Sequence, residues 1–156
     1  MIDSDNIFYS LTDVDTILPQ IKKLTKAHWD EAGVKLENEE LMLDTNMLHS
    51  IEALGTLRII QAVDTSIDKI VGYVVFNITQ SMFGISLIAS SIAFYVSPEY
   101  RNLGIAKEML MFADIHFTQE GVDFIQVGLK NKLGSLHGSI TDIGYELDEL
   151  VYLKRI

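Results

Sequence analysis

The segment EYRNLGIAKEML, residues 99–110, combines an arginine, a glycine and an alanine at R-x-x-G-x-A spacing, where an apolar strand pattern changes to a helical one. The N-terminus of a helix has unpaired N–H groups and about half a positive charge, so it attracts anions. Gly104 has no Cβ to hold an anion away from those amides, and Arg101 adds a cation with a forked set of donors. The spacing therefore indicates an anion site, although a plain helix start that contains a glycine is an open alternative.

Two other phosphate-binding patterns are absent from the sequence. It contains no G-x-x-x-x-G-K-[ST] segment, which a P-loop nucleotide site requires. It also has no G-x-G-x-x-G after any predicted strand, which is the fingerprint of a dinucleotide site. The anion, if one is bound, is therefore held in a different way.

The elements that must position this loop alternate between strands and helices. Runs rich in Ile, Val, Tyr and Phe predict strands at 6–11, 56–63, 69–79, 85–96, 123–129 and 150–156. Apolar residues at helical spacing predict helices over 12–33, 39–54, 104–120 and 134–143. This order predicts an α/β (α+β) protein whose mixed central sheet has helices on both faces.

The composition limits the class of protein. A chain of 156 residues that is 48% hydrophobic is the right size for one domain, residues 1–156, with one sizeable core. There is no apolar stretch of about twenty residues and no basic segment followed by an apolar run near the start, so we expect no transmembrane helix, no membrane partner and no signal peptide. With no cysteine, disulfides and thiolate chemistry are not expected either. A cytoplasmic protein is the resulting expectation.

The charge is strongly acidic. Lys and Arg number 12 against 22 Asp and Glu, a formal net charge of −10, which argues against a nucleic-acid partner. The first fifty residues hold ten of the acids and four lysines. This half is either an ordinary solvated surface or a region that attracts a cationic partner such as an amine.

The strand IAFYVSPEYR, followed by R-x-x-G-x-A and a long amphipathic helix, resembles motif A of the GNAT N-acetyltransferases. The order of the predicted elements and the late GYE at 144–146 also match this family, so the resemblance covers nearly the whole chain. It implies the GNAT acyl-CoA N-acyltransferase fold, acetyl-CoA as the cofactor and an amine acceptor, either a small molecule or a protein. GNAT domains often dimerise, and the sequence leaves open whether this chain forms a homodimer.

The resemblance also implies a set of cofactor-binding residues. In this family the R-x-x-G-x-A loop wraps the pyrophosphate of CoA, and the preceding strand holds the pantetheine arm through its backbone, with one amide stabilising the oxyanion. An asparagine after the next strand often contacts the cofactor. The corresponding residues here are Phe94, Tyr95, Val96, Arg101, Asn102, Leu103, Gly104, Ile105, Ala106 and Asn131.

The family's catalytic residues have no counterpart here. Many members carry a glutamate base about eleven residues before the motif arginine and a tyrosine acid four residues before the glycine of G-[FY]; these positions are Ser90 and Ile140. A primary amine with a pKa near 10.4 is mostly protonated at neutral pH, so something must still remove its proton. The sequence alone assigns that role to neither position.

His28 is the best candidate for the base. It follows Ile21 and Leu24 on the apolar stripe of the first predicted helix, which in GNAT folds borders the acceptor, and Glu31 lies within one turn of it. A carboxylate at that position would orient the imidazole and raise its pKa. The alternative is a core histidine bonded to a neighbouring carbonyl, with Glu31 as a solvated side chain.

Three classes of function therefore stay open. The first is an N-acetyltransferase that uses acetyl-CoA and a primary amine in a ternary complex. The second is a GNAT module that binds CoA without chemistry and acts in regulation or interaction, which the residues at 90 and 140 favour. The third is a structural protein unrelated to CoA. Binding of CoA separates the third class from the others, and release of CoA in the presence of amines separates the first from the second.

Overall fold

The computed structural model describes residues 3–34, 37, 39–130, 134–149 and 151–154 of the chain. These residues form a five-stranded sheet in the order β1-β2-β3-β4-β5. Its strands are β1 (Ile7–Thr12), β2 (Leu57–Asp64), β3 (Lys69–Gln80), β4 (Leu87–Val96) and β5 (Phe124–Gln126). Neighbours are antiparallel except β5, which runs parallel to β4. The expected mixed sheet is therefore confirmed.

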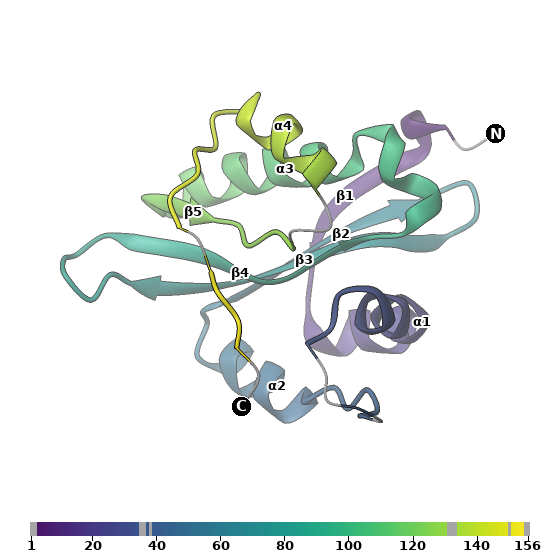
Figure 1. The fold of residues 1–156 in the computed structure, drawn as a ribbon, viewed down its shortest axis with the longest axis horizontal. Helices are drawn as coiled ribbons and strands as arrows, with labels where there is room; N and C mark the ends of the chain where they lie inside the picture. Colours follow the sequence, from purple (N-terminus) through teal and green to yellow (C-terminus); the bar gives the residue numbers. More distant parts are fainter. Residues whose placement is uncertain (1–2, 35–36, 38, 131–133, 150, 155–156) are drawn as a thin grey trace.

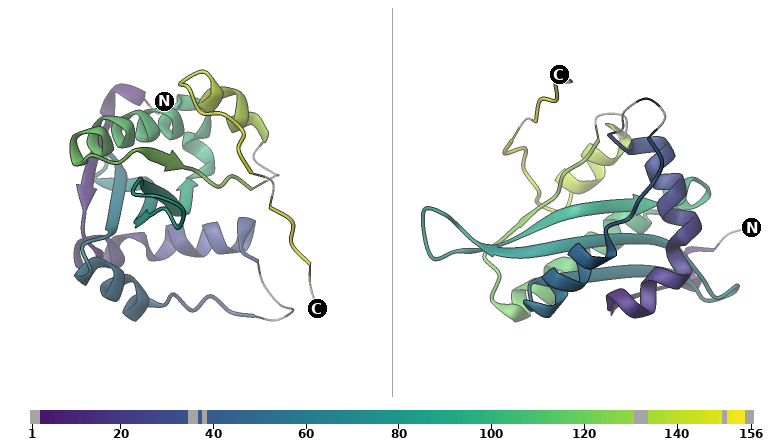
Figure 2. Two further views of the ribbon diagram at one scale, coloured as in Figure 1. Left: turned by 90° about the vertical axis from the view of Figure 1, so that its left-hand side faces the viewer. Right: turned by 90° about the horizontal axis from the view of Figure 1, so that it is seen from below.

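Helices cover both faces of this sheet, as the sequence predicts (Figure 1). The helices α1 (Val14–Ala32) and α2 (Thr45–Ala53) lie on one face, and α3 (Ile105–Glu120) and α4 (Gly134–Thr141) lie on the other (Figure 2). Short 3-10 helices, η1 (Ser4–Asn6) and η2 (Pro98–Leu103), precede β1 and α3. Within the described ranges, no helix is long and apolar enough to span a bilayer.

The central strand β3 separates two apolar cores. Its side chains alternate between the faces, so Val74 and Phe76 pack with Phe117 on the α3 side, whereas Tyr73 and Val75 pack on the α1 side. Because both faces are covered, β3 is a nearly continuous apolar run rather than an alternating one. The cores therefore fix the distance of α1 and α3 from the sheet.

Hydrogen bonds at the first turn of α1 fix the position of this helix. The Asp13 side chain caps the helix by accepting from the Thr16 N–H at 2.7 Å. The Glu52 side chain of α2 accepts from the Val14 N–H at 2.8 Å, so α2 also holds the start of α1. At its other end, α1 stops at Gly33. This placement brings the last turns of α1 to the edge of the sheet where β4 ends.

Two predicted boundaries are wrong. The second helix does not include residues 39–44 and begins at Thr45, because the Asp44 side chain caps it by accepting from the Met47 N–H. The strand predicted at 123–129 is only Phe124–Gln126, because the Gly128 N–H donates to the Ser91 side chain instead of continuing a backbone ladder. The first correction shortens α2, and the second ends the pairing of β4 with β5.

The predicted closing strand is also not formed where the structure describes it. Residues 151–154 have no regular secondary structure, and Val151, Tyr152 and Leu153 are largely exposed. Their apolar pattern favours a strand, but in the described part of the chain they have no ladder partner to form one. The sheet therefore ends at β5.

Gly72→Ala should lower the free energy of unfolding by about 1–3 kcal/mol, because this site is tightly packed. A Cβ at Gly72 would lie 3.2 Å from the Tyr95 carbonyl oxygen and 3.3 Å from Met109 Sδ, so either the sheet or α3 has to shift. Denaturant unfolding followed by circular dichroism measures the change. Gly84→Ala is the matched control, because a Cβ there meets nothing within 4 Å. Equal losses in the two variants would contradict the close packing.

Candidate active site

The outer edge of β4 is paired for only part of its length. The strand β5 pairs with Ile88, Ala89 and Ser90, and beyond Ser90 no described strand continues this side of β4. At the same point the β3–β4 register shifts, so that Phe76 lies opposite Ser91, Val75 lies opposite Ala93 and Ile92 is bulged. The two parallel strands therefore separate and leave a stretch of β4 with backbone groups facing the gap.

The ladder identifies which backbone groups these are. The Ser97 N–H donates to the Val71 carbonyl, so these two residues form a hydrogen-bonded pair. In an antiparallel ladder the bonded pairs alternate, so Ala93 and Tyr95 direct their backbone groups to β3. Phe94 and Val96 direct theirs away from β3, into the gap. In agreement, the Val96 carbonyl accepts a hydrogen bond from the Arg101 Nε–H at 2.9 Å.

The N-terminus of α3 follows directly after this strand and the short helix η2. Gly104, which precedes α3, has a φ of 76°, a left-handed conformation that glycine adopts most easily. No side chain caps α3, and a Cβ at Gly104 would meet nothing within 4 Å. The N-terminus of α3 is therefore not capped by a side chain and has open space beside Gly104, as an anion site requires.

The other residues of the loop divide into two groups. Ile105 is fully buried, and Leu103 and Ala106 pack partly against the core, so these side chains anchor the loop. Asn102 is exposed beside Gly104. The remaining cofactor candidate, Asn131, lies outside the described residues.

Arg101 is held more firmly than its sequence position suggests. Its two terminal nitrogens donate to Glu31 Oε1 and Oε2 at 2.6 Å each, so the pair is bidentate. Its guanidinium also lies 5.2 Å from the centre of the Tyr95 ring. The cation that the sequence predicts here is therefore part of an ion pair between η2 and the last turn of α1. Among the described residues, no group of three or more His, Cys, Asp or Glu side chains could hold a metal ion.

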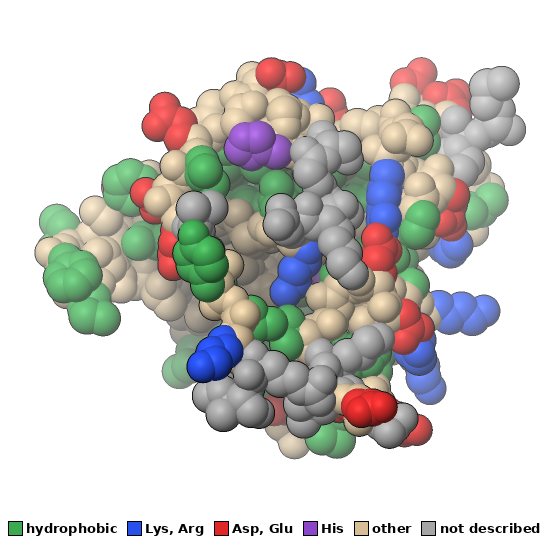
Figure 3. All heavy atoms as spheres, viewed as in Figure 1, with side chains coloured by type: hydrophobic (Ala, Val, Ile, Leu, Met, Phe, Trp, Pro, Cys, Tyr) green, Lys and Arg blue, Asp and Glu red, His purple; other side chains and the backbone are tan. Residues whose placement is uncertain are grey.

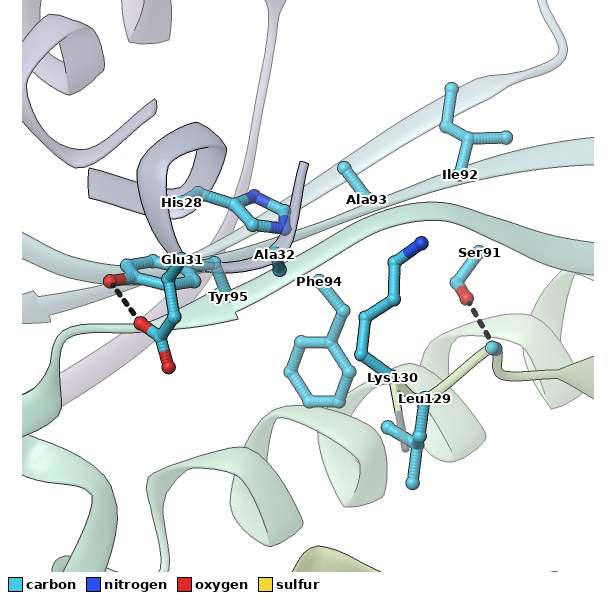
Figure 4. Close-up of a pocket in the computed structure, with 11 residues that line it drawn as sticks. His28, Glu31, Ala32, Ser91, Ile92, Ala93, Phe94, Tyr95, Leu129 and Lys130 are labelled. Atoms are coloured by element: carbon cyan, nitrogen blue, oxygen red, sulfur yellow. Dashed lines mark hydrogen bonds between the residues drawn. The ribbon is translucent and has the colours of Figure 1, made fainter. Parts of the chain in front are cut away.

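A cavity of about 100 Å³ lies where these parts meet. Its walls are the last turns of α1, residues 91–95 of β4 and residues 128–130 (Figure 4). The face of the molecule seen in Figure 3 is hollowed near its centre. Lys130 was not among the predicted site residues. Its side chain extends from the wall formed by residues 128–130 toward β4 (Figure 4).

His28 lines this cavity and contacts two aromatic side chains. Its Nδ1 lies 2.7 Å from the Tyr73 hydroxyl oxygen, within hydrogen-bond distance, and its ring stacks on Tyr95 with 4.7 Å between centres. Burial lowers the pKa of His28; the Glu31 carboxylate partly opposes this effect, while Lys130 and Arg101 add to it. These surroundings therefore favour the neutral imidazole. Tyr73 was not among the predicted site residues, because it stands in an apolar strand pattern typical of a core.

Contrary to the expectation from the sequence, Glu31 does not orient His28. Its carboxylate accepts hydrogen bonds from Arg101 and from the Tyr95 hydroxyl, the latter at 3.0 Å, and these bonds lower the pKa of Glu31. The reason is geometric, because Glu31 turns toward η2 and the end of β4. The histidine is oriented by Tyr73 instead.

The two positions where many family members carry an acid or a base hold no titratable group here. The Ser90 hydroxyl donates to the Gln126 side chain at 3.1 Å, and Ile140 is buried in the core. Neither side chain can therefore exchange a proton near neutral pH.

The chain belongs to the GNAT family: the family model described as "Acetyltransferase (GNAT) family" matches residues 21–133. Comparison with curated protein sequences finds no significant match.

Solved acetyltransferases share the fold. An aminoglycoside acetyltransferase from an uncultured soil metagenomic sample, solved with sisomicin, has a TM-score of 0.76 at 12% identity and covers 97% of each chain. The ribosomal-protein-alanine N-acetyltransferase from Brucella melitensis biovar Abortus 2308 has a TM-score of 0.70 at 14% identity and covers 96% of this chain and 99% of its own. Glucosamine-6-phosphate N-acetyltransferase from Arabidopsis thaliana has a TM-score of 0.70 at 9% identity, over 96% and 97%. At these identities the likeness concerns the fold alone.

Titration of His28 by NMR should give a pKa below the ordinary value of about 6.5. Because the folded state then takes up this proton less readily than the unfolded chain, His28 makes the protein less stable as the pH falls below about 6.5. Lys130→Gln should raise the pKa of His28, because it removes a nearby positive charge. His49→Gln, on α2, is a control that should leave the resonance of His28 unchanged. A pKa of His28 above 6.5 would contradict its burial.

Proposed function

We propose that this protein transfers an acetyl group from acetyl-CoA to a primary amine acceptor, by direct attack in a ternary complex. One observation carries the proposal. The edge of β4 at Phe94 and Val96, which no described strand covers, leads through η2 to the start of α3 at Gly104, where no side chain caps the helix. A linear arm that carries amide groups and ends in an anion fits such a surface, because a strand edge binds amides and a helix N-terminus binds anions. The pantetheine and pyrophosphate of CoA have this chemistry.

The residues fit the cofactor in two ways. The N–H and C=O of Phe94 and the N–H of Val96 are directed to the side of β4 where the arm would lie. Gly104 is exposed, and the open space around its Cβ position leaves room for the pyrophosphate beside Ala106, whereas Ile105 is fully buried. In the proposed complex Asn102 and Asn131 contact the cofactor, while Leu103 anchors the loop. Tyr95 contributes its ring rather than its backbone, which is used by β3.

Arg101 has a double role in this proposal. Of its five N–H donors, one binds the Val96 carbonyl and two bind Glu31, so at most two are left for an anion. The pairing with Glu31 fixes the guanidinium beside the cofactor site, at the cost of part of its attraction for phosphate. Glu31 is therefore a positioning residue, which holds Arg101 and Tyr95 at the mouth of the site.

His28 is the proposed base. Acetyl-CoA supplies the activated acetyl thioester, and the Phe94 N–H is the backbone donor aimed at the gap where charge would develop. His28 can accept the proton of the amine at Nε2 when its Nδ1–H donates to the Tyr73 hydroxyl oxygen, the tautomer that leaves Nε2 with a lone pair. In this tautomer Tyr73 accepts the Nδ1–H, and Nε2 is the basic nitrogen.

A second candidate function is a GNAT module that binds CoA without transferring acetyl groups. The absence of a titratable side chain at Ser90 and Ile140 favours it. Steady release of CoA from acetyl-CoA on addition of amines supports the enzyme, and tight binding without release supports the module.

Gly104→Ala should weaken binding of acetyl-CoA at least about tenfold, because a Cβ there would occupy the space in which the helix amides meet the pyrophosphate. Isothermal titration calorimetry measures the dissociation constant. Gly121→Ala is a closely matched control: Gly121 also has a φ of 76° and open space around its Cβ position, but it lies at the far end of α3. Both variants should lose about 1–2 kcal/mol of stability from backbone strain. Equal affinity in both would remove Gly104 from the cofactor site.

His28→Gln should lower turnover by about 10²–10⁴-fold and leave the affinity for acetyl-CoA unchanged. The rate of the natural protein should rise with pH through a step below about 6.5, because the lowered pKa of His28 sets the point at which the base becomes free. The variant should lose this step. Stopped assays of CoA release across the pH range measure it, with His49→Gln as the control. If His28 is only a core residue, its variant will melt at a lower temperature and keep the pH profile.

A further inference from the structure

A second cavity lies on the α1 side of the sheet, between α1, α2 and strands β2 to β4. Its volume is about 200 Å³, twice that of the first cavity. We call it the apolar groove; its walls include Ile17, Ile21, Met47, Leu48, Ile59 and Val75. No charged side chain lines it among the described residues.

The two hydroxyl groups in the apolar groove are already engaged. Thr25 donates to backbone carbonyls of its own helix, at Ile21 and Lys22. The Tyr73 hydroxyl lies within hydrogen-bond distance of His28 Nδ1. A polar or charged ligand group in the groove would therefore find no free partner, and its desolvation would be uncompensated.

The groove adjoins the proposed active site. Ile92 and Ala93 of β4 line both cavities, at the bulge where the register of β4 shifts. Tyr73 lines the groove, and its hydrogen-bond partner His28 lines the active-site cavity. A molecule whose amino group reaches His28 can therefore extend its other end into the groove.

The groove also differs from ordinary core packing, because α2 covers it loosely. No residue of α2 is fully buried, and Met47 remains 47% exposed although it lines the groove. By comparison, α1 buries Val14, Ile17, Ile21 and Leu24 against the same face. The space under α2 is thus accessible and is filled neither by side chains nor by polar contacts.

We propose that the acceptor is a primary amine whose body next to the amino group is an apolar chain, and that the apolar groove binds this chain. The inference rests on the proposed function and names its class of acceptor. An acceptor with several ammonium groups along its length is disfavoured, because the groove offers no carboxylate to receive a second charge.

Two amines of equal length test this choice. Hexylamine and 1,5-diaminopentane have the same number of heavy atoms, but the diamine carries a second ammonium group where hexylamine has a methyl group. The kcat/KM for hexylamine should exceed that for the diamine at least about tenfold. From ethylamine through butylamine to hexylamine, kcat/KM should rise by about fourfold for each methylene that the groove buries.

A charge placed in the groove should abolish this preference. Met47→Asp should lower kcat/KM for hexylamine at least about tenfold, with little effect on ethylamine or on the dissociation constant of acetyl-CoA. Met111→Asp is the control, because Met111 is a helical methionine of similar exposure, 39%, on α3 at the opposite face. Calorimetric titration of the CoA-loaded protein with each amine gives the same comparison for binding.

The outcomes separate this inference from the proposed function. If CoA is released equally well with hexylamine and with the diamine, the enzyme stands and the apolar acceptor is refuted. A second outcome is that no amine releases CoA, but binding strengthens with chain length as stated and Met47→Asp loses the binding of hexylamine. In that case the groove stands and the catalytic proposal is refuted. If no amine releases CoA and the binding of amines does not depend on chain length, both are overturned.

Discussion

The whole site depends on where β4 and β5 stop pairing. Three residues of β4 pair with β5, and then the Gly128 N–H turns to the Ser91 side chain and the chain leaves the sheet. A sheet edge in the middle of a protein is normally covered, because unpaired N–H and C=O groups are costly to bury. Here the edge stays open at Phe94 and Val96, between the two layers of helices. The cavity, the start of α3 at Gly104 and the position of His28 are all arranged around that opening.

A chain of contacts connects this opening to α1. Arg101 binds both the end of β4 and Glu31, Glu31 accepts from the Tyr95 hydroxyl, and Tyr95 stacks on His28. The Arg101–Glu31 pair is about a third exposed, so as an isolated ion pair it contributes little stability. Its effect is on geometry: it ties the loop before α3 to the last turn of α1. Residues proposed for cofactor binding and for proton transfer are thereby held in one network.

The sequence predicted what depends on local pattern, and missed what depends on pairing between distant residues. The strand 85–96 and the helix after Gly104 follow from hydrophobic period and from a glycine at a helix start, and both are present. In contrast, Arg101 and Glu31 are seventy residues apart, and His28 and Tyr73 are forty-five apart. No local rule relates such residues. Glu31 was assigned to His28 because they share a helix face, but a cation and a hydroxyl from other elements bind the carboxylate instead.

The burial that lowers the pKa of His28 would also act on an amine bound beside the apolar groove. In both cases it disfavours the charged form of the base. In water an amine with a pKa near 10.4 is about four units more basic than imidazole, so moving its proton to histidine costs about 5 kcal/mol. An apolar surrounding reduces this difference when it desolvates the ammonium more than the imidazole, which keeps its bond to Tyr73. In the proposed complex the groove would therefore select the acceptor and also make its amino group easier to deprotonate, which a weak base such as His28 requires.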